Sequence, residues 1–306
     1  MSDQNGVRGV CAAVLTPLTQ RLEPDAERAI PYYRRLLQNG CNTINLLGTT
    51  GEALSLTISQ RLSFMKAVAA ELPVSRMMVG TSASALCDAG ELAQAAKSLG
   101  FGGALIMPPR PTAALSEAGI ARYYASIAHS IGDEEPFLYL YNFPRLSGVA
   151  FTMDLVDRLM GELGPVIAGI KDSANDLAYE KAVAQAYPQL AVFPSSECHL
   201  LSARRFGLAG CISGTVCLWP ERAQSIWEHD DNSTAEIAQR ELCALRTEVE
   251  QHTLIPAVRF LTALQQGDDA WEGTIPPMQR LIDQSREALS AVANMDSAIS
   301  MLDGSK

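Results

Sequence analysis

The stretch Val166-Ile167-Ala168-Gly169-Ile170 is a short apolar run that ends at Lys171. It lacks an alternation of polar and apolar residues, which is typical of a strand buried on both faces of a parallel sheet. Seven further segments of this kind recur along the chain, each followed by a stretch of helical periodicity: Val10–Leu15, Thr43–Leu47, Met77–Val79, Ala104–Met107, Phe137–Tyr141, Ala191–Phe193 and Gly210–Ser213. Eight strand and helix units predict an α/β fold of the (β/α)8 TIM-barrel class.

The helical stretches between these segments begin with recognisable capping residues. Thr57 followed by Gln60 has the sequence of a capping box, Ser116 precedes Gly119 at a second start, and Thr152 precedes a third. A doubly wound open sheet is the alternative fold, but the sequence contains neither G-x-G-x-x-G after the first strand nor G-x-x-x-x-G-K-[ST]. The count of eight segments favours the barrel.

The chain from about Pro220 onward is rich in Ala, Leu, Glu and Arg and has no strand signal. Its helical pattern is expected to break at Pro256, Gly267 and Pro276-Pro277. We expect additional C-terminal helices that pack against the barrel wall or a neighbouring subunit. The predicted division is a catalytic barrel over residues 1–225 and a helical extension over residues 226–306.

The composition indicates a compact globular protein, with 47% hydrophobic and 19% charged residues in a chain of 306. The net charge of −10 is expected to repel nucleic acid and anionic membranes. The apolar runs are far shorter than the roughly 20 residues that span a bilayer. The N-terminal stretch lacks a signal-peptide cleavage pattern. We therefore expect a mature N-terminus, a cytoplasmic protein, and neither nucleic acid nor membrane as a partner.

The cysteines and histidines do not form a metal-binding pattern. The seven cysteines are scattered and include no C-x-x-C pair, which favours free thiols in a reducing compartment. None of the four histidines lies four residues from another histidine. We therefore expect no bound metal. The histidines concerned are His129, His199, His229 and His252.

In a barrel, reactive side chains emerge where the strands end, which directs attention to Lys171. The chain has only four other lysines, three in helical stretches and one at its end: Lys66, Lys97, Lys181 and Lys306. Lys171 ends an apolar run and is expected to point into the barrel mouth, where desolvation would favour a neutral amine that attacks a carbonyl. The alternative is a lysine that reaches solvent or pairs with Asp172.

Two other strand ends carry candidate groups. Tyr141 ends the strand before that of Lys171, and its phenol could transfer a proton near an imine, although a core tyrosine with a satisfied hydroxyl is the alternative. Thr49 and Thr50 lie in a turn flanked by glycines whose N–H groups and hydroxyls could bind an anion. A tight strand-to-helix loop without function is the alternative for this turn.

Four motifs in this order resemble the dihydrodipicolinate synthase/N-acetylneuraminate lyase family: Thr16-Pro17, Gly48-Thr49-Thr50-Gly51-Glu52, Tyr141-Asn142-Phe143-Pro144 and Gly169-Ile170-Lys171. The resemblance runs from about Val7 to Trp219, and the helical C-terminal region also suits it. It implies a (β/α)8 barrel with class I, metal-free Schiff-base chemistry on pyruvate or another small 2-oxo acid. It also implies a homo-oligomer, a homotetramer or a homodimer.

Residue by residue, the resemblance implies that Lys171 forms the imine, Tyr141 relays protons and Thr49 supports Tyr141 by a hydrogen bond. Thr50 is expected to help hold the carboxylate of the 2-oxo acid. The further substrate-binding residues are predicted to be Thr16, Gly48, Ser173, Glu197, Arg110 and Ile212. No cofactor is expected beyond the covalent imine with the substrate.

Departures from the family pattern bear on the substrate. Leu146 stands where the synthases carry an arginine, and the following Ser-Gly resembles the lyases instead. Arg110 stands where the synthases carry a second tyrosine. Glu197 lies in a stretch that replaces the Gly-x-Asp-Glu of the lyases, and with Ser173 it could bind a polyol chain. Arg110 and Arg145 are expected either to bind a distal anion or to be solvated loop charges.

The leading hypothesis is a pyruvate-dependent class I aldolase that cleaves or forms a 2-oxo-3-deoxy sugar acid or a related hydroxylated 2-oxo acid. A 4-hydroxy-tetrahydrodipicolinate synthase and a 2-oxo-3-deoxy acid dehydratase are the enzymatic alternatives, since both share the imine. A silent barrel that binds 2-oxo acids is the non-enzymatic alternative. A pyridoxal phosphate enzyme is disfavoured, because only the stretch Gly210–Gly214 could cradle a phosphate.

Overall fold

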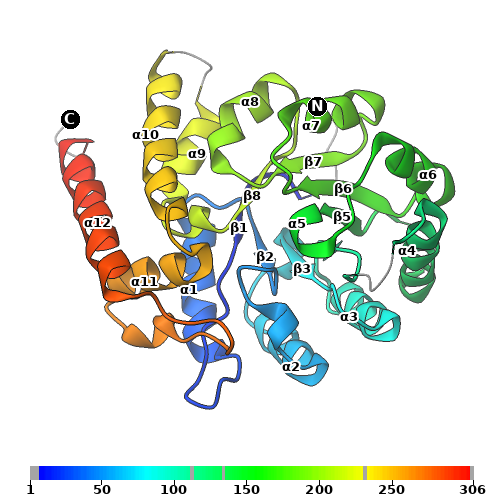
Figure 1. The fold of residues 1–306 in the computed structure, drawn as a ribbon, viewed down its shortest axis with the longest axis horizontal. Coiled ribbons are helices and arrows are strands. Elements are labelled where there is room, and N and C mark those ends of the chain that lie inside the picture. Colours follow the sequence, from blue (N-terminus) through cyan, green and yellow to red (C-terminus); the bar gives the residue numbers. More distant parts are fainter. Residues whose placement is uncertain (1–6, 111–113, 133–134, 230–232, 304–306) are drawn as a thin grey trace.

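The computed structural model describes residues 7–110, 114–132, 135–229 and 233–303. Eight strands alternate with helices around a central sheet (Figure 1). The strands are β1 (Gly9–Ala13), β2 (Thr43–Leu46), β3 (Met77–Gly80), β4 (Gly103–Ile106), β5 (Leu138–Asn142), β6 (Ile167–Asp172), β7 (Ala191–Pro194) and β8 (Gly210–Ser213). Each coincides with one of the eight predicted segments to within one or two residues at either end.

The sheet is parallel throughout, in the order β7-β6-β5-β4-β3-β2-β1-β8. The two end strands also meet, because the Ala209 N–H donates a hydrogen bond of 2.8 Å to the Val192 carbonyl. The strands therefore form a nearly closed barrel, and the predicted (β/α)8 TIM-barrel class is confirmed.

Helices follow the strands in turn. The longer ones beside the barrel are α1 (Ala26–Gln38), α2 (Ile58–Ala69), α3 (Leu86–Ser98), α4 (Glu117–Ile131), α6 (Met153–Leu163), α7 (Leu177–Ala186) and α9 (Pro220–Glu228). The short ones are α5 (Pro144–Ser147) and α8 (Leu200–Arg205), with 3-10 turns η1 (Ala53–Ser55), η2 (Val74–Arg76), η3 (Glu197–His199) and η4 (Thr215–Cys217). The predicted caps are present: Thr57 and Gln60 form a capping box, and the Ser116 and Thr152 hydroxyls accept bonds from the first turns.

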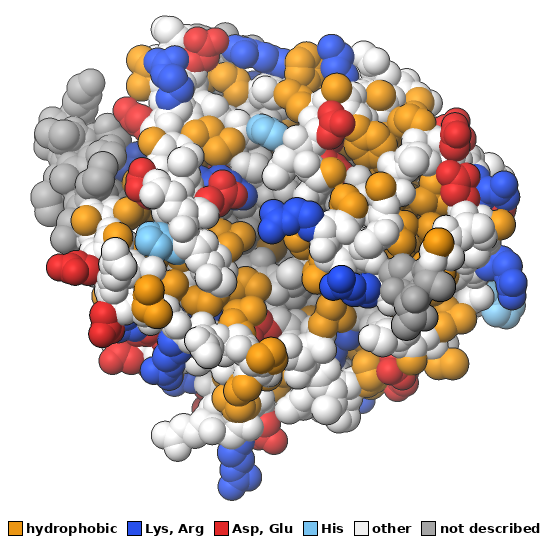
Figure 2. Space-filling model, in the orientation of Figure 1, with side chains coloured by type: hydrophobic (Ala, Val, Ile, Leu, Met, Phe, Trp, Pro, Cys, Tyr) orange, Lys and Arg blue, Asp and Glu red, His pale blue; other side chains and the backbone are white. Residues whose placement is uncertain are grey.

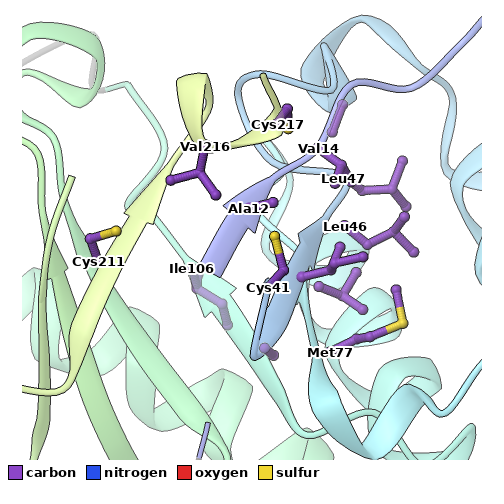
Figure 3. Packing of buried hydrophobic residues seen from close by; sticks show 14 of the residues in the cluster. Ala12, Val14, Cys41, Leu46, Leu47, Met77, Ile106, Cys211, Val216 and Cys217 are labelled. Atoms are coloured by element: carbon purple, nitrogen blue, oxygen red, sulfur yellow. The ribbon is translucent and has the colours of Figure 1, made fainter. Parts of the chain in front are cut away.

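Buried side chains alternate between the two sides of each strand. On β1, Val10 and Ala12 belong to the large cluster between the sheet and the helices, whereas Cys11 belongs to a second cluster inside the barrel. Figure 3 shows residues of the large cluster, among them Leu46, Met77 and Ile106, on neighbouring strands. The inner cluster closes the barrel below its carboxyl end with Cys11, Met78, Leu105, Tyr139, Phe193 and Ile212. The barrel is a packed core and not a pore.

The additional C-terminal helices are α10 (Ser233–Glu250), α11 (Leu254–Gln266) and α12 (Asp283–Asp303), with the 3-10 turn η5 (Asp269–Glu272) between the last two. In Figure 1 they lie along one side of the barrel, near α1 and α9. Trp271 of η5 packs its ring 4.7 Å from that of Tyr32 on α1. The predicted C-terminal helices are thus present, and they share the large hydrophobic cluster with the barrel.

The helix break that was expected at Pro256 is wrong. Pro256 lies in the first turn of α11, where a missing N–H breaks no helical hydrogen bond. Gly267 does end α11, with a left-handed φ of 62°. The predicted domain boundary between residues 225 and 226 falls inside α9.

The net charge of −10 predicts that the surface binds neither nucleic acid nor membranes. On the face in Figure 2, acidic and basic side chains of the described residues are interspersed. Within the described ranges, no helix combines the length and the apolar character that crossing a bilayer requires.

Close packing at Gly169, in the middle of β6, generates a stability prediction. A Cβ there would lie 2.2 Å from the Ala191 carbonyl oxygen and 2.9 Å from Tyr139 Cδ1, whereas a Cβ on Gly161 of α6 would meet nothing within 4 Å. Gly169→Ala should therefore lower the free energy of unfolding by about 1–3 kcal/mol. Gly161→Ala, the control, should raise it by about 0.5–1 kcal/mol. Urea unfolding measures both, and equal effects of the two substitutions would contradict the packing.

Candidate active site

A cavity of about 700 Å³ lies at the carboxyl ends of the strands. From the barrel it is lined by Thr49, Thr50, Tyr141, Phe143, Arg145, Lys171, Ser173, Asn175, Ser195, Ile212 and Gly214. From the C-terminal region it is lined by Arg246, Glu250, His252, Thr253, Leu254, Ile255 and Met278. Its position is the one where (β/α)8 enzymes hold their reactive groups.

Lys171 on β6 and Tyr141 on β5 are paired in register, so their side chains emerge together. Both are only 6% exposed, and the Lys171 Nζ lies 4.7 Å from the centre of the Tyr141 ring. The Asp172 carboxylate does not pair with Lys171 but accepts hydrogen bonds from Asn142 Nδ2 at 2.6 Å and Asp176 N at 3.3 Å. The register of two neighbouring strands thus places a buried amine and a phenol side by side.

The other lysines are placed as expected, as far as the structure describes them. Lys66 lies on α2, Lys97 on α3 and Lys181 on α7, and Lys306 lies outside the described residues. Among the described lysines, Lys171 is therefore the one that lines the cavity.

The Tyr141 hydroxyl accepts a hydrogen bond of 3.5 Å from the Ser173 hydroxyl. The Tyr141 ring also stacks against Phe143, with ring centres 5.7 Å apart. The resemblance implied a hydrogen bond from Thr49 to this hydroxyl, and this role of Thr49 stays a prediction. Thr49 lines the same cavity, but the described contacts of the Tyr141 oxygen come from Ser173, which follows Lys171 out of the same strand.

The turn after β2 is tightly closed. Gly51 N donates to the Gly48 carbonyl at 3.1 Å, and Glu52 N donates to the Thr49 carbonyl at 3.0 Å. Thr50 leans against the exit of β8, since a Cβ on Gly214 would lie 3.0 Å from the Thr50 hydroxyl oxygen. The turn thereby holds two threonine hydroxyl groups at the wall of the cavity.

The structure brings together six of the predicted site residues at the cavity: Thr49, Thr50, Tyr141, Lys171, Ser173 and Ile212. The predicted substrate-binding residues that do not line it are Thr16, Gly48, Arg110 and Glu197. Thr16 is fully buried below the turn, and Gly48 contributes to the turn through its backbone carbonyl. Arg110 is exposed to solvent away from the lining, whereas Arg145 on α5 does line the cavity.

The prediction that Glu197 binds a polyol directly is wrong, because its carboxylate is fully buried and already accepts hydrogen bonds from other side chains. It accepts a hydrogen bond of 2.5 Å from the Thr215 hydroxyl and one of 2.6 Å from Arg246 Nη1. The same Arg246 nitrogen contacts the Ser213 hydroxyl at 2.7 Å. Glu197 therefore contacts Arg246, which lines the cavity, and does not line the cavity itself.

Sequence reasoning missed the contribution of the C-terminal helices. Arg246 and Glu250 lie one turn apart on α10, and Arg246 Nη2 contacts Glu250 Oε1 at 2.6 Å. The only sequence signal is this i,i+4 spacing, which on its own is typical of a solvated helix face. It gives no indication that the helix end reaches the barrel mouth.

A second buried ion pair joins the turn after β2 to α11. Glu52, which has a left-handed φ of 53°, receives the Arg259 guanidinium at 2.6 Å. Arg259 also donates to the Thr16 carbonyl at 2.9 Å and to the Trp271 carbonyl at 3.2 Å. The glutamate of the Gly-Thr-Thr-Gly-Glu motif is thus a structural residue that fixes the turn to the C-terminal helices.

Two carboxyl groups lie behind the catalytic candidates, on the helix side of β6. Glu180 of α7 is fully buried beside Asp172. Burial, and next the negative charge of Asp172, raise the pKa of the Glu180 carboxyl to about 8. Burial also raises the pKa of Asp172. Glu180 therefore holds its proton to a higher pH than an exposed glutamate does.

No metal site emerges from the described ranges, in which no three His, Cys, Asp or Glu side chains gather in a way that could hold an ion. The stretch Gly210–Gly214 forms β8 and its exit, and the Ser213 hydroxyl is engaged by Arg246.

The comparisons with known proteins agree with this fold. The family model described as the dihydrodipicolinate synthetase family matches residues 6–295. A DapA-like lyase of Chloroflexus aurantiacus is 31% identical over 255 residues, 82% of this chain and 85% of its own. The N-acetylneuraminate lyase of an Enterobacter strain is 27% identical over 239 residues, 77% of this chain and 79% of its own.

Among solved structures, a variant of the 2-keto-3-deoxygluconate aldolase of Sulfolobus solfataricus superposes with a TM-score of 0.85 at 20% identity. The match covers 96% of this chain and 98% of that one, and it shows the shared fold. The molecule is thus a (β/α)8 barrel with a lysine and a tyrosine at the mouth. The chain belongs to the dihydrodipicolinate synthetase family, which confirms the resemblance found in the sequence.

The raised pKa of Glu180 generates a pH prediction. Because this pKa is about 8 in the folded protein and near 4.5 in the unfolded chain, the folded state binds more protons between these values. The free energy of unfolding should therefore fall as the pH rises through this window. Glu180→Gln should flatten that fall, as measured by urea unfolding at pH 5 and pH 8. The control, Glu241→Gln at an exposed position, should keep the slope of the unmodified protein.

The buried pair of Arg246 and Glu197 generates a second prediction. Arg246→Met should lower the free energy of unfolding by about 3–5 kcal/mol, because it leaves the Glu197 charge buried without a partner. Arg158→Met, the control, breaks an ion pair whose side chains are 44% and 46% exposed and should cost less than about 1 kcal/mol. Adding Glu197→Gln to Arg246→Met should recover stability, and a further loss in the double variant would argue against the pairing.

Proposed function

We propose that the chain is a pyruvate-dependent class I aldolase, a carbon–carbon lyase that uses a Schiff base on Lys171. The observation that carries the proposal is the buried Lys171 amine at the cavity, in register with Tyr141 and without a carboxylate partner among the described residues. An amine in this position can become a nucleophile toward a ketone. The names of the similar proteins, lyases and aldolases, support the same class.

The reaction follows from the positions of the two groups. The Lys171 amine adds to the ketone carbon of a 2-oxo acid, and loss of water gives a protonated imine. The C3–C4 bond then breaks, its electron pair moves into the imine, and the proton of the C4 hydroxyl passes to the Tyr141 oxygen, which has first given its own proton to the water that leaves. An aldehyde leaves. Protonation of the enamine at C3 and addition of water release pyruvate and the free lysine.

The other lining groups have roles in positioning the substrate. Thr49 and Thr50 present hydroxyl groups from the turn after β2, and we assign them to the carboxylate of the 2-oxo acid. Ser173 holds the Tyr141 hydroxyl and so orients the proton relay. No cofactor takes part, because the imine itself is the electron sink.

The proposed substrate is a 2-oxo-3-deoxy sugar acid or a related hydroxylated 2-oxo acid. A cavity of about 700 Å³ is larger than the six heavy atoms of pyruvate require, and ligand sites of this size hold larger molecules. Arg145 at the cavity favours a second candidate, a synthase or dehydratase whose substrate carries a distal carboxylate. All of these reactions begin with the same imine.

We also propose a cytoplasmic homotetramer or homodimer. All seven cysteines are free, in keeping with a reducing compartment.

The test is borohydride reduction in the presence of pyruvate, followed by intact mass measurement and peptide mapping. We expect one adduct, on Lys171, and none in Lys171→Ala, whereas Lys97→Ala should retain it. Tyr141→Phe should still form the adduct but should cleave 2-oxo-3-deoxy acids about 10²–10⁴ times more slowly. A folded protein that binds pyruvate without any adduct would favour the silent binding barrel over the enzyme.

A further inference from the structure

The far wall of the cavity comes from outside the barrel. Five residues at the end of α10 and the start of α11 line it: Glu250, His252, Thr253, Leu254 and Ile255. In Figure 1, α10 and α11 lie on the side of the barrel near β1 and β8, whereas β5 and β6 with the reactive pair lie on the other side. A substrate whose 2-oxo group sits at Lys171 therefore extends its other end toward this segment.

Glu250 is the only carboxylate among the described residues that line the cavity. Its Oε1 atom is held by Arg246 Nη2 at 2.6 Å, and its side chain is 47% exposed. Arg246 is itself only 7% exposed and is fixed on its other side by the fully buried Glu197. Arg246 is thus shared between two carboxylates, Glu197 and Glu250, and the Glu250 Oε2 atom has no described hydrogen bond.

His252 stands beside this carboxylate in the chain and lines the same wall. Its Nδ1 atom lies 3.0 Å from the Ser285 hydroxyl, which fixes the orientation of the ring. The other ring nitrogen is then available as a hydrogen-bond donor or acceptor. The wall thus combines a fixed hydrogen-bond acceptor, Glu250, with His252, whose second ring nitrogen can donate or accept a hydrogen bond.

This chemistry selects among the possible substrates. A carboxylate binds groups that donate hydrogen bonds, such as hydroxyls, and it repels a terminal carboxylate or phosphate. We propose that Glu250, positioned by Arg246, recognises with His252 the distal hydroxyl groups of the substrate, so that the site selects polyhydroxylated 2-oxo-3-deoxy acids. The inference rests on the proposed function for the placement of the 2-oxo group at Lys171.

The test compares Glu250→Gln with Glu241→Gln, both in a Lys171→Ala background that cannot cleave the ligand. Glu241 lies exposed on the same helix, nine residues earlier, or about 13 Å along its axis, and its variant makes the same change of charge. The probe is 2-oxo-3-deoxygluconate, and calorimetry gives its Kd and that of pyruvate. Thermal unfolding checks that each variant is folded.

We expect Glu250→Gln to raise the Kd of 2-oxo-3-deoxygluconate about tenfold. The Kd of pyruvate, which has no distal hydroxyl, should not change. Glu241→Gln should leave both unchanged. An unchanged Kd for the sugar acid in Glu250→Gln, an equal loss for pyruvate, or a sugar acid that binds no better than pyruvate would overturn the inference. The borohydride test on the unmodified protein decides the proposed function separately, because it depends on Lys171 and not on Glu250.

Discussion

The ion pair between Arg259 and Glu52 is the constraint on which the site depends most. Both side chains are almost completely buried, and a buried charge without a partner is strongly unfavourable. Arg259 therefore has to reach Glu52, and in doing so it also contacts the carbonyl of Thr16 and that of Trp271. The pair ties α11 to the turn that carries Thr49 and Thr50. The C-terminal helices are thus part of the architecture of the site.

A parallel arrangement exists on α10. Arg246 joins Glu197 after β7 to the hydroxyls of Ser213 at the end of β8 and Thr215 just after it. The two arginines fix the exits of four strands, β1, β2, β7 and β8, to the same pair of helices. They give the barrel mouth a wall whose polar groups are held in place, which is what discrimination between substrates requires. The chemistry sits on the strands, and the helices shape the space around it.

The reactive pair depends on simpler physics. Neighbouring parallel strands in fixed register present Tyr141 and Lys171 at the same level, and the packed interior below them keeps water out. Gly169 allows β6 to approach β7 and the Tyr139 ring closely. Because these contacts come from regular pairing, the position of the lysine beside the tyrosine does not depend on the other residues around the cavity. Those other residues can differ without disturbing the pair.

The sequence by itself determined the barrel and the placement of a lysine and a tyrosine at its mouth. The eight apolar segments, the capping residues and the lysine at a strand end are local features, since each depends on neighbours a few residues away. Only the tertiary structure decided the rest. Four predicted residues do not line the cavity: Thr16, Gly48, Arg110 and Glu197. Three residues that were not predicted do line it: Arg246, Glu250 and His252. These outcomes depend on which buried charges find each other across the fold, such as Glu197 and Arg246, 49 residues apart. No local pattern encodes such a pairing, because its energy arises only when folding excludes water from both partners.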